Sequence, residues 1–568
     1  MFPFHNTARD PLADARSVAR WVAGFPVGDP LAAHGQVLAE LGRIAERAAR
    51  RTPARLAAVF ELDARCSALR EALTTQYIEH ANRSSKIEHQ LWSALFDLSQ
   101  AFLLAYQAFA REMPSRTHMA KWRDLLPELV CRQLIQLGFD ARTRLYRFEQ
   151  WIPAKWAELH GLFSLACSQQ IERVPLAVSQ GGATSTIEHE YLLVLLLQLI
   201  NAGNLTPRQL DWIASELPEW SAALRLNIEP SSVTSFYVDV ASREGLRRRP
   251  AVPLEGRVLF LDTRPLHALL TQHALMVEQK IREQPLSERT PRRTEQLSLL
   301  RKLAAQVDPE FRPFARRGER TAAVGTVDAI VGFAKIASYL KEEERNPVPQ
   351  IDAGDSFGGT MELAVFGHAR NEKDRRLELA RRRLGTYAAP GGPWEVKDVS
   401  QTGYRLVAPM SVANAVTLNT LAAIRAHGHG AWMLGIVRRM KRLTADRAEI
   451  GLQIIANTLA GVDLMEQRKN VDDDYSVDGE GITINGRSFG ALLLALRKRP
   501  GDPPVQSLVV PAVEFQPAKR FKLVTSRSTA SVRFGRLLEQ QPEWVWTGLE
   551  PFGQGKTRVA AADGGSAT

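Results

Sequence analysis

The chain has 568 residues, of which 45% are hydrophobic and 24% are charged, and its formal net charge is +11. This composition is that of a globular protein large enough to bury several cores, and it excludes a mainly disordered, collagenous or fibrous chain. The basic charge favours anionic partners such as nucleotides, nucleic acid or acidic membrane faces, without choosing among them.

The sequence predicts a cytoplasmic protein without disulfides. Its three cysteines are far apart and form no Cys-x-x-Cys or Cys/His cluster, so neither a zinc site nor a disulfide framework is expected. The first residues lack a basic segment followed by an apolar run, and no signal peptide is expected. The longest apolar stretch, Tyr191–Ile200, is shorter than the about 20 residues that span a bilayer, so we expect a soluble chain with no membrane span.

Apolar residues follow a helical period from Leu31 to about Leu226, as in the stripe of Val37, Leu41 and Ile44. Proline at the first turn predicts helices that begin at Pro53 and, after Thr206 as an N-cap, at Pro207. Helices are predicted over Trp92–Ala110, Met119–Leu137, Pro153–Glu172, Thr186–Ala202 and Thr206–Leu224. We expect residues 1–230 to form an all-α scaffold domain, either a helical bundle or an irregular solenoid.

The period then changes, which predicts an α+β chain overall. Residues 231–310 should form a mixed connector with strands over Val233–Val240 and Val258–Asp262 and helices over His267–Arg282 and Arg293–Gln306. We expect an antiparallel β-barrel over residues 311–464, with a flexible insertion at about 341–390 that is rich in charge, proline and glycine. Residues 465–550 add strands that form either a second small β-domain or an extension of the barrel, and residues 551–568 are a disordered tail.

One motif in the β-rich half carries readable chemistry. Asp398-Val399-Ser400-Gln401-Thr402-Gly403 lies between the predicted strand Trp394–Ser400 and the extended segment Tyr404–Val407. The Asp398 carboxylate could accept two N–H donors from a guanine edge, and Ser400 offers a hydroxyl beside it. We expect Gly403 to supply the positive φ of a tight turn.

The strands after this motif complete a small barrel pattern. A short strand is predicted over Leu421–Arg425, followed by a hairpin of Ala431–Arg442 and Glu449–Ala456. This order of Asp-x-Ser-x-x-Gly and later strands resembles the PilZ domain, the bacterial receptor module for cyclic di-GMP. The resemblance covers about a quarter of the chain and leaves out the helical half.

The family also has an Arg-x-x-x-Arg motif before the first barrel strand. Several arginine pairs have this spacing, among them Arg438/Arg442, but Arg316/Arg320 runs directly into the β-like stretch Ala323–Phe333 and therefore has the family's layout. Arg320 lies 78 residues before Asp398 (398 − 320), farther than is usual in the family. Because the entropy of loop closure grows slowly with length, an insertion between neighbouring strands is tolerable.

The resemblance implies a receptor that binds cyclic di-GMP and needs no cofactor or metal. It implies ligand-binding roles for the motif residues Arg316, Arg317, Arg320, Asp398, Ser400 and Gly403. Arginine forks can bond the two phosphodiesters and stack on a base, while the turn contacts guanine. The signal would leave through the helical domain to an unidentified protein partner.

Other motifs give no support for catalysis or metal binding. Gly553–Thr557 ends like a P-loop but Glu550 replaces its first glycine, and Asp474–Asn485 begins like an EF-hand loop but lacks the final glutamate. His427-Gly428-His429 lacks a third ligand, and Glu188-His189-Glu190 lacks a second zincin histidine. We therefore expect a non-enzyme.

Two alternatives to the receptor remain open. The first is an adaptor whose PilZ-like barrel no longer binds nucleotide. The second is a non-specific nucleic-acid binder driven by the net charge of +11. We do not expect specific nucleic-acid binding, because the chain lacks an obvious recognition helix or aromatic RNA-binding motif.

Overall fold

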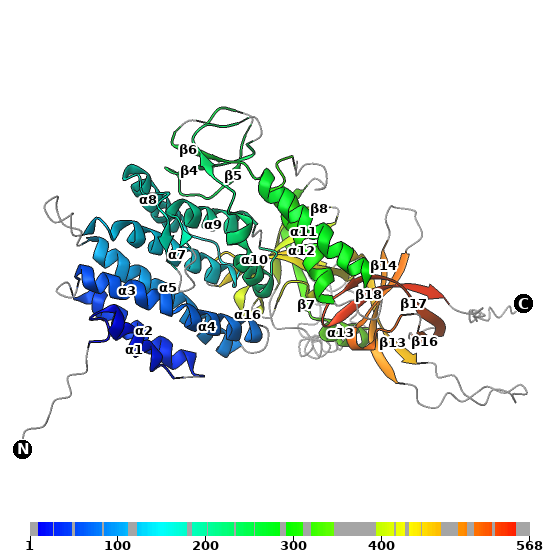
Figure 1. Cartoon of the computed structure of the whole chain (residues 1–568). Helices are drawn as coiled ribbons and strands as arrows, with labels where there is room; N and C mark the ends of the chain where they lie inside the picture. Colours follow the sequence, from blue (N-terminus) through cyan, green and yellow to red (C-terminus); the bar gives the residue numbers. More distant parts are fainter. Residues whose placement is uncertain are drawn as a thin grey trace, which may run out of the picture. The chain divides into compact units, whose positions relative to one another are not determined.

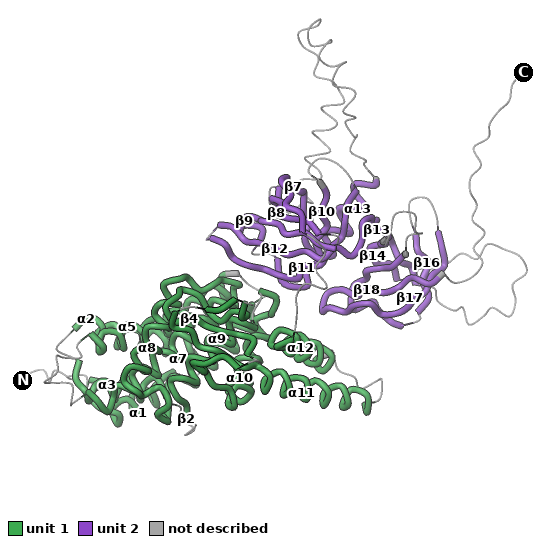
Figure 2. The backbone as a smooth tube through the Cα atoms, turned by 90° about the horizontal axis from the view of Figure 1, so that it is seen from above, with its two compact units in different colours: residues 1–316 green, residues 317–568 purple. Residues whose placement is uncertain are grey.

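The structure is a computed structural model of the whole chain. It describes residues 10–26, 28–47, 51–81, 85–111, 122–178, 184–200, 203–231, 234–250, 252–254, 256–284, 291–310, 320–345, 393–400, 402–413, 416–426, 431–444, 446–466, 487–496, 505–517, 519–524 and 529–551. The chain folds into two compact units, residues 1–316 and 317–568, which are green and purple in Figure 2. Among the described helices, none is long and apolar enough to cross a membrane.

The first unit is mainly helical, as the apolar periodicity predicts (Figure 1). Its helices are α1 (Ala15–Ala23), α2 (Pro30–Glu46), α3 (Pro53–Arg65), α4 (Ser67–His80), α5 (Ser85–Arg111), α7 (Leu126–Leu145), α8 (Pro153–Ser168), α9 (Ile187–Ile200), α10 (Pro207–Trp220), α11 (Arg264–Glu283) and α12 (Pro291–Val307). Asp29, Thr52 and Thr206 cap helices that begin with proline, and Thr206 forms a full capping box with Gln209. The predicted start after Thr206 is therefore confirmed.

Helix α7 differs from its prediction, which ended at Leu137. It continues for two more turns because Leu137, Ala141 and Leu145 extend one buried stripe to Leu145. Gly138 does not end the helix. A Cβ at Gly138 would lie 3.5 Å from the Val194 side chain of α9, an ordinary van der Waals contact.

A small sheet shares the core of the helices. The short strands of this unit are β1 (Leu176–Ala177), β2 (Thr184–Ser185), β3 (Leu226–Asn227), β4 (Phe236–Asp239), β5 (Arg247–Arg248) and β6 (Val258–Leu261). The last four form an antiparallel sheet in the order β3-β6-β4-β5. Phe236, Val238 and Leu261 belong to the same buried cluster as the helices, so the expected division at residue 230 falls inside one continuous core.

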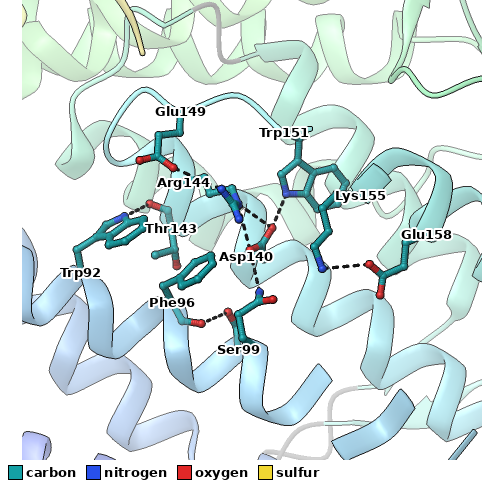
Figure 3. A network of polar contacts seen from close by, with 11 residues as sticks. Trp92, Phe96, Ser99, Asp140, Thr143, Arg144, Glu149, Trp151, Lys155 and Glu158 are labelled. Atoms are coloured by element: carbon teal, nitrogen blue, oxygen red, sulfur yellow. Dashed lines mark hydrogen bonds and ion pairs between the residues drawn. The ribbon is translucent and has the colours of Figure 1, made fainter. Parts of the chain in front are cut away.

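A buried carboxylate joins α5, α7 and the segment before α8 (Figure 3). Asp140 is fully buried, and its oxygens accept hydrogen bonds from Gln100 Nε2 at 2.9 Å, Trp151 Nε1 at 2.6 Å and Arg144 Nε at 3.2 Å. Arg144 also contacts Glu149 at 3.4 Å. Both oxygens of Asp140 thus accept hydrogen bonds, which offsets the cost of burying its charge.

The second unit begins with a closed antiparallel barrel, as the sequence predicts. Its elements are β7 (Thr321–Val331), α13 (Phe333–Arg345), β8 (Trp394–Ser400), β9 (Gly403–Pro409), α16 (Met410–Ala413), β10 (Leu421–Ala426), β11 (Met433–Arg442) and β12 (Arg447–Ala456). The strand order is β10-β11-β12-β9-β8-β7. The insertion expected from residue 341 begins later, because α13 remains helical to Arg345; residues 346–392 lie outside the described part of the chain.

The C-terminal strands form a second closed barrel, which decides between the two alternatives that the sequence left open. Its elements are β13 (Thr458–Glu466), β14 (Ser488–Leu496), β15 (Val505–Pro511), the 3-10 turn η4 (Ala512–Glu514), β16 (Arg520–Val524), β17 (Thr529–Gln540) and β18 (Trp544–Pro551). The expected boundary between 464 and 465 falls inside β13, whose partners are β14 and β16.

The two barrels have the same connectivity. Replacing each strand of the first barrel by the strand six places later gives β16-β17-β18-β15-β14-β13. This is the order of the second barrel, β13-β14-β15-β18-β17-β16, read in the opposite direction. Both β9 and β15 end at the proline of a Leu-Val-x-Pro sequence, Pro409 in β9 and Pro511 in β15. A short helical turn follows each strand. Gly451 lies opposite Arg405 in the first barrel, as Gly548 lies opposite Ser507 in the second. The second barrel is therefore a structural repeat of the first.

Helix α13 and strands of both barrels share one buried cluster. Ile336 and Leu340 of α13 pack in it with Leu434 and Ile436 of the first barrel. The second barrel contributes Leu492, Leu494, Val509 and Trp544 to the same cluster. Burial of this apolar surface stabilises the contact between the barrels, so the second unit has a common core as well as two barrel interiors.

Candidate ligand-binding site

The Asp-x-Ser-x-x-Gly motif forms the turn between β8 and β9. A β-bulge precedes it: Val396 lies opposite Leu406, whereas Asp398 lies opposite the next residue back, Arg405. Since neighbouring residues of a strand point to opposite faces, this bulge moves Asp398 from the face of buried Leu406 to the face of Arg405. The carboxylate therefore lies on the outer face of the barrel.

Glycine is required at position 403 because the backbone of β12 approaches it closely, and not because its φ angle is positive. Gly403 is absent from the glycines of positive φ among the described residues, so the expected left-handed turn is wrong. A Cβ at this position would lie 2.7 Å from the carbonyl oxygen of Leu452 in β12. Ser400 Oγ donates to Gly403 O at 3.3 Å, and Ile454 N donates to Thr402 O at 3.0 Å, so the turn lies tightly against β12.

Arg320 meets the motif across a large separation in sequence. It immediately precedes β7, which pairs with β8 so that Ala322 lies opposite Asp398. Arg320 Nη1 is 3.0 Å from Asp398 Oδ1, although 78 residues separate them in the chain. The long insertion leaves the pairing of β7 with β8 intact. Arg316 and Arg317 lie outside the described residues.

Arg405 is a site residue that the sequence reasoning missed. Its Nη2 is 2.6 Å from Asp398 Oδ2, and its Nη1 is 3.7 Å from Glu449 Oε2 on β12. The signal that could have found it is the strand period, because Arg405 lies two residues after Gly403 and so shares its face. Asp398 is thus paired with two arginines, one from the segment before β7 and one from β9.

The arginine side chains of this face are exposed enough to contact an anionic ligand. The Asp398 side chain is 10% exposed, whereas those of Arg320 and Arg405 are 49% and 42% exposed. Arg405 Nε is buried and makes no hydrogen bond to any described residue. The two guanidinium groups balance the charges of Asp398 and Glu449, and their unused N–H donors can bond phosphate oxygens.

The second barrel does not repeat this chemistry at the corresponding register positions. Leu494 lies opposite Ser507, and this pair follows the pair of Leu493 and Leu508. Leu494 and Ser507 therefore occupy the positions that Asp398 and Arg405 have in the first barrel. Leu494 is fully buried in the cluster shared by the barrels. At this register position, the described second barrel therefore has no counterpart of Asp398 and its paired arginine. No cluster of three or more potential metal ligands occurs within the described part of the chain either.

Comparisons with known proteins match a family model in the helical part and one curated relative over a longer stretch. The family model described as the N-terminal domain of the cyclic-di-GMP receptor FimW matches residues 16–231. The chain is also 23% identical over 412 residues to the cyclic-di-GMP receptor FimW of Pseudomonas aeruginosa. This alignment covers 65% of the chain, more than residues 1–316 provide, so it reaches into the second unit; it covers 63% of the relative. Neither match names a PilZ domain, and no solved structure matches the chain.

Proposed function

We propose that this protein is a cyclic di-GMP receptor that binds the nucleotide on the outer face of its first barrel. The observation that carries the proposal is the meeting of Arg320 and Arg405 at Asp398. The proposal draws support from the similarity to a protein named as a cyclic-di-GMP receptor and from the resemblance of the motif and barrel strands to the PilZ domain. The first barrel is accordingly proposed to be the PilZ-like module.

Binding then exchanges partners at Asp398. Cyclic di-GMP carries two phosphodiesters and two guanines, so its phosphates compete with Asp398 for the guanidinium groups. Each pair joins a half-exposed guanidinium group to a carboxylate that is only 10% exposed, so release of the arginines requires a new partner for Asp398. New hydrogen bonds between charged groups contribute about 1.5–3 kcal/mol each. The released carboxylate is free to accept the N–H donors of a guanine edge, with the Ser400 hydroxyl beside it.

Arg316 and Arg317 are proposed to add to the phosphate contacts from the segment before Arg320. We also propose that the protein acts in the cytoplasm as a non-enzymatic effector that signals through its helical unit to a protein partner. The similarity of residues 16–231 to the N-terminal domain of a receptor supports a role of this unit in the response.

Titration calorimetry of the purified full-length chain tests the proposal. Cyclic di-GMP should give saturable heat, and GTP and cyclic AMP should give much weaker heat or none, because they lack the second guanine and the two ring phosphodiesters. No heat and no thermal shift with cyclic di-GMP at high micromolar concentration would favour an adaptor that does not bind nucleotide.

A further inference from the structure

A polar bridge connects the candidate site with the second barrel. Arg438 on β11 donates from Nε to Gln453 Oε1 at 2.8 Å, and from Nη1 and Nη2 to the two carboxylate oxygens of Glu539 at 2.8 and 2.6 Å. Glu539 belongs to β17 of the second barrel. These three residues, Gln453, Arg438 and Glu539, are called the Arg438 bridge below.

One end of the bridge lies beside the motif turn. Gln453 is opposite Gly403 in the pairing of β12 with β9. Its two neighbours in the chain contact the turn directly. The carbonyl oxygen of Leu452 lies close to Gly403, and Ile454 N donates a hydrogen bond to Thr402 O. Any displacement of Gln453 along β12 therefore moves the backbone that positions Ser400 and Gly403.

The other end is held firmly by the second barrel. The Glu539 carboxylate also accepts a hydrogen bond from Gln541 Nε2 at 2.9 Å, and its side chain is only 20% exposed. Arg438 is further fixed by Asn419 Oδ1 at 3.1 Å. A bidentate pair of this kind sets orientation as well as distance, because both groups are planar.

We propose that the Arg438 bridge positions the nucleotide-binding turn, so that the second barrel contributes a positioning residue, Glu539, to the site of the first. Arg438 is one of the arginines with Arg-x-x-x-Arg spacing, and the bridge gives it a role other than ligand contact. The effect on affinity rests on the proposed function, whereas the effect on the turn concerns the protein without ligand.

Hydrogen exchange of the ligand-free full chain tests the positioning. Glu539→Gln keeps the shape of the side chain and removes its charge, and it should speed exchange of the Ile454 amide and of peptides that cover residues 402–404. The matched control is Asp463→Asn, which removes the ion pair of Asp463 with Lys341 of α13 (2.5 Å) at the same junction. This control should leave exchange of the turn unchanged.

A charge reversal separates the bridge from general loss of stability. The other partners of the pair, Gln453, Asn419 and Gln541, are all amides, which can turn to present either oxygen or nitrogen. The double variant Arg438→Glu with Glu539→Arg should therefore restore slow exchange, while Arg438→Glu alone should not. Equal effects of Glu539→Gln and Asp463→Asn, no effect of Glu539→Gln, or no rescue by the reversal would each overturn the proposal.

Affinity provides the second readout. Glu539→Gln should weaken cyclic di-GMP binding at least threefold in calorimetry, the reversal should recover most of this loss, and Asp463→Asn should stay within twofold of the native chain. An unchanged affinity of Glu539→Gln, in a native chain that binds, overturns the inference. A native chain that binds no cyclic di-GMP overturns the proposed function instead, and the exchange experiment then decides the inference alone.

Discussion

Arg320 and Asp398 are 78 residues apart in the chain, and their side chains are 3.0 Å apart in the structure. Their meeting follows from the antiparallel pairing of β7 with β8, which puts the end of one strand beside the start of the other. The contact places a cation from the segment before the first barrel strand on the carboxylate of the motif turn. This relationship makes the outer face of the first barrel the place to test for ligand binding.

The two arginines at Asp398 should both be required for cyclic di-GMP. Arg320→Ala and Arg405→Ala each remove charged hydrogen bonds worth about 1.5–3 kcal/mol to the ligand, which corresponds to roughly a ten- to hundredfold loss of affinity. Calorimetry measures this loss. Arg533→Ala is the control, because Arg533 forms an exposed pair with Glu550 on the second barrel. A loss for Arg320→Ala without one for Arg405→Ala would leave Arg405 a structural partner of Asp398.

Gly403→Ala should destabilise the first barrel and prevent ligand binding. The added methyl group would lie 2.7 Å from Leu452 O, so the turn must move away from β12, at a cost of about 1–3 kcal/mol. Gly325→Ala is the matched control on β7, where an added Cβ meets no atom within 4 Å. Chemical denaturation of the two variants measures the difference, and equal stability of both would show that the Leu452 carbonyl yields easily.

Asp140→Ala should destabilise the helical unit strongly. The substitution leaves Arg144, Trp151 Nε1 and Gln100 Nε2 without their shared acceptor (Figure 3), and breaking a buried ion pair in this way costs about 3–5 kcal/mol. Asp262→Ala removes an exposed pair with Arg264 and should change the free energy of unfolding by less than about 1 kcal/mol. Urea denaturation followed by circular dichroism compares them. A small effect of Asp140→Ala would mean that the three donors find other acceptors.

Glu190 gives the helical unit a dependence on pH. Burial raises the pKa of this carboxyl from its ordinary value of 4.5 to about 6, while the hydrogen bond from Ser185 Oγ at 2.6 Å opposes the shift. Because the folded pKa is above the unfolded one, the stability that protonated Glu190 provides is fully present below pH 4.5 and is lost as the pH rises through about 6.

Glu190→Gln should therefore raise the free energy of unfolding by about 1–2 kcal/mol at pH 7–8 relative to the native chain, with the gain disappearing near pH 4. Thermal melts over this pH range measure it. Glu188→Gln is the contrast, since Glu188 is paired with Arg173 at 2.8 Å and accepts from Leu226 N, and this variant should be less stable at pH 7. A loss of stability in Glu190→Gln at pH 7 would contradict the assignment.

Local patterns in the sequence predicted much of the fold. Capping residues and first-turn prolines located the helix starts at Pro53 and Pro207, and the alternation around Trp394 and the hairpin after Ala431 predicted barrel strands. These signals act within one or two turns or one strand, so they can be read in a short window. Gly403 was found in the same way, but its reason was misread because the atom that requires it, Leu452 O, belongs to a distant strand.

The sequence by itself determined the α+β composition, the order of helical and β-rich halves, and the Asp398 motif. Only the tertiary structure decided that the C-terminal strands close a second barrel, that Arg405 joins Arg320 at Asp398, and that Arg438 pairs with Glu539. Each of these depends on strand register, and one bulge is enough to move a side chain to the opposite face. Register is set by packing among residues tens to hundreds of positions apart, which no local pattern contains.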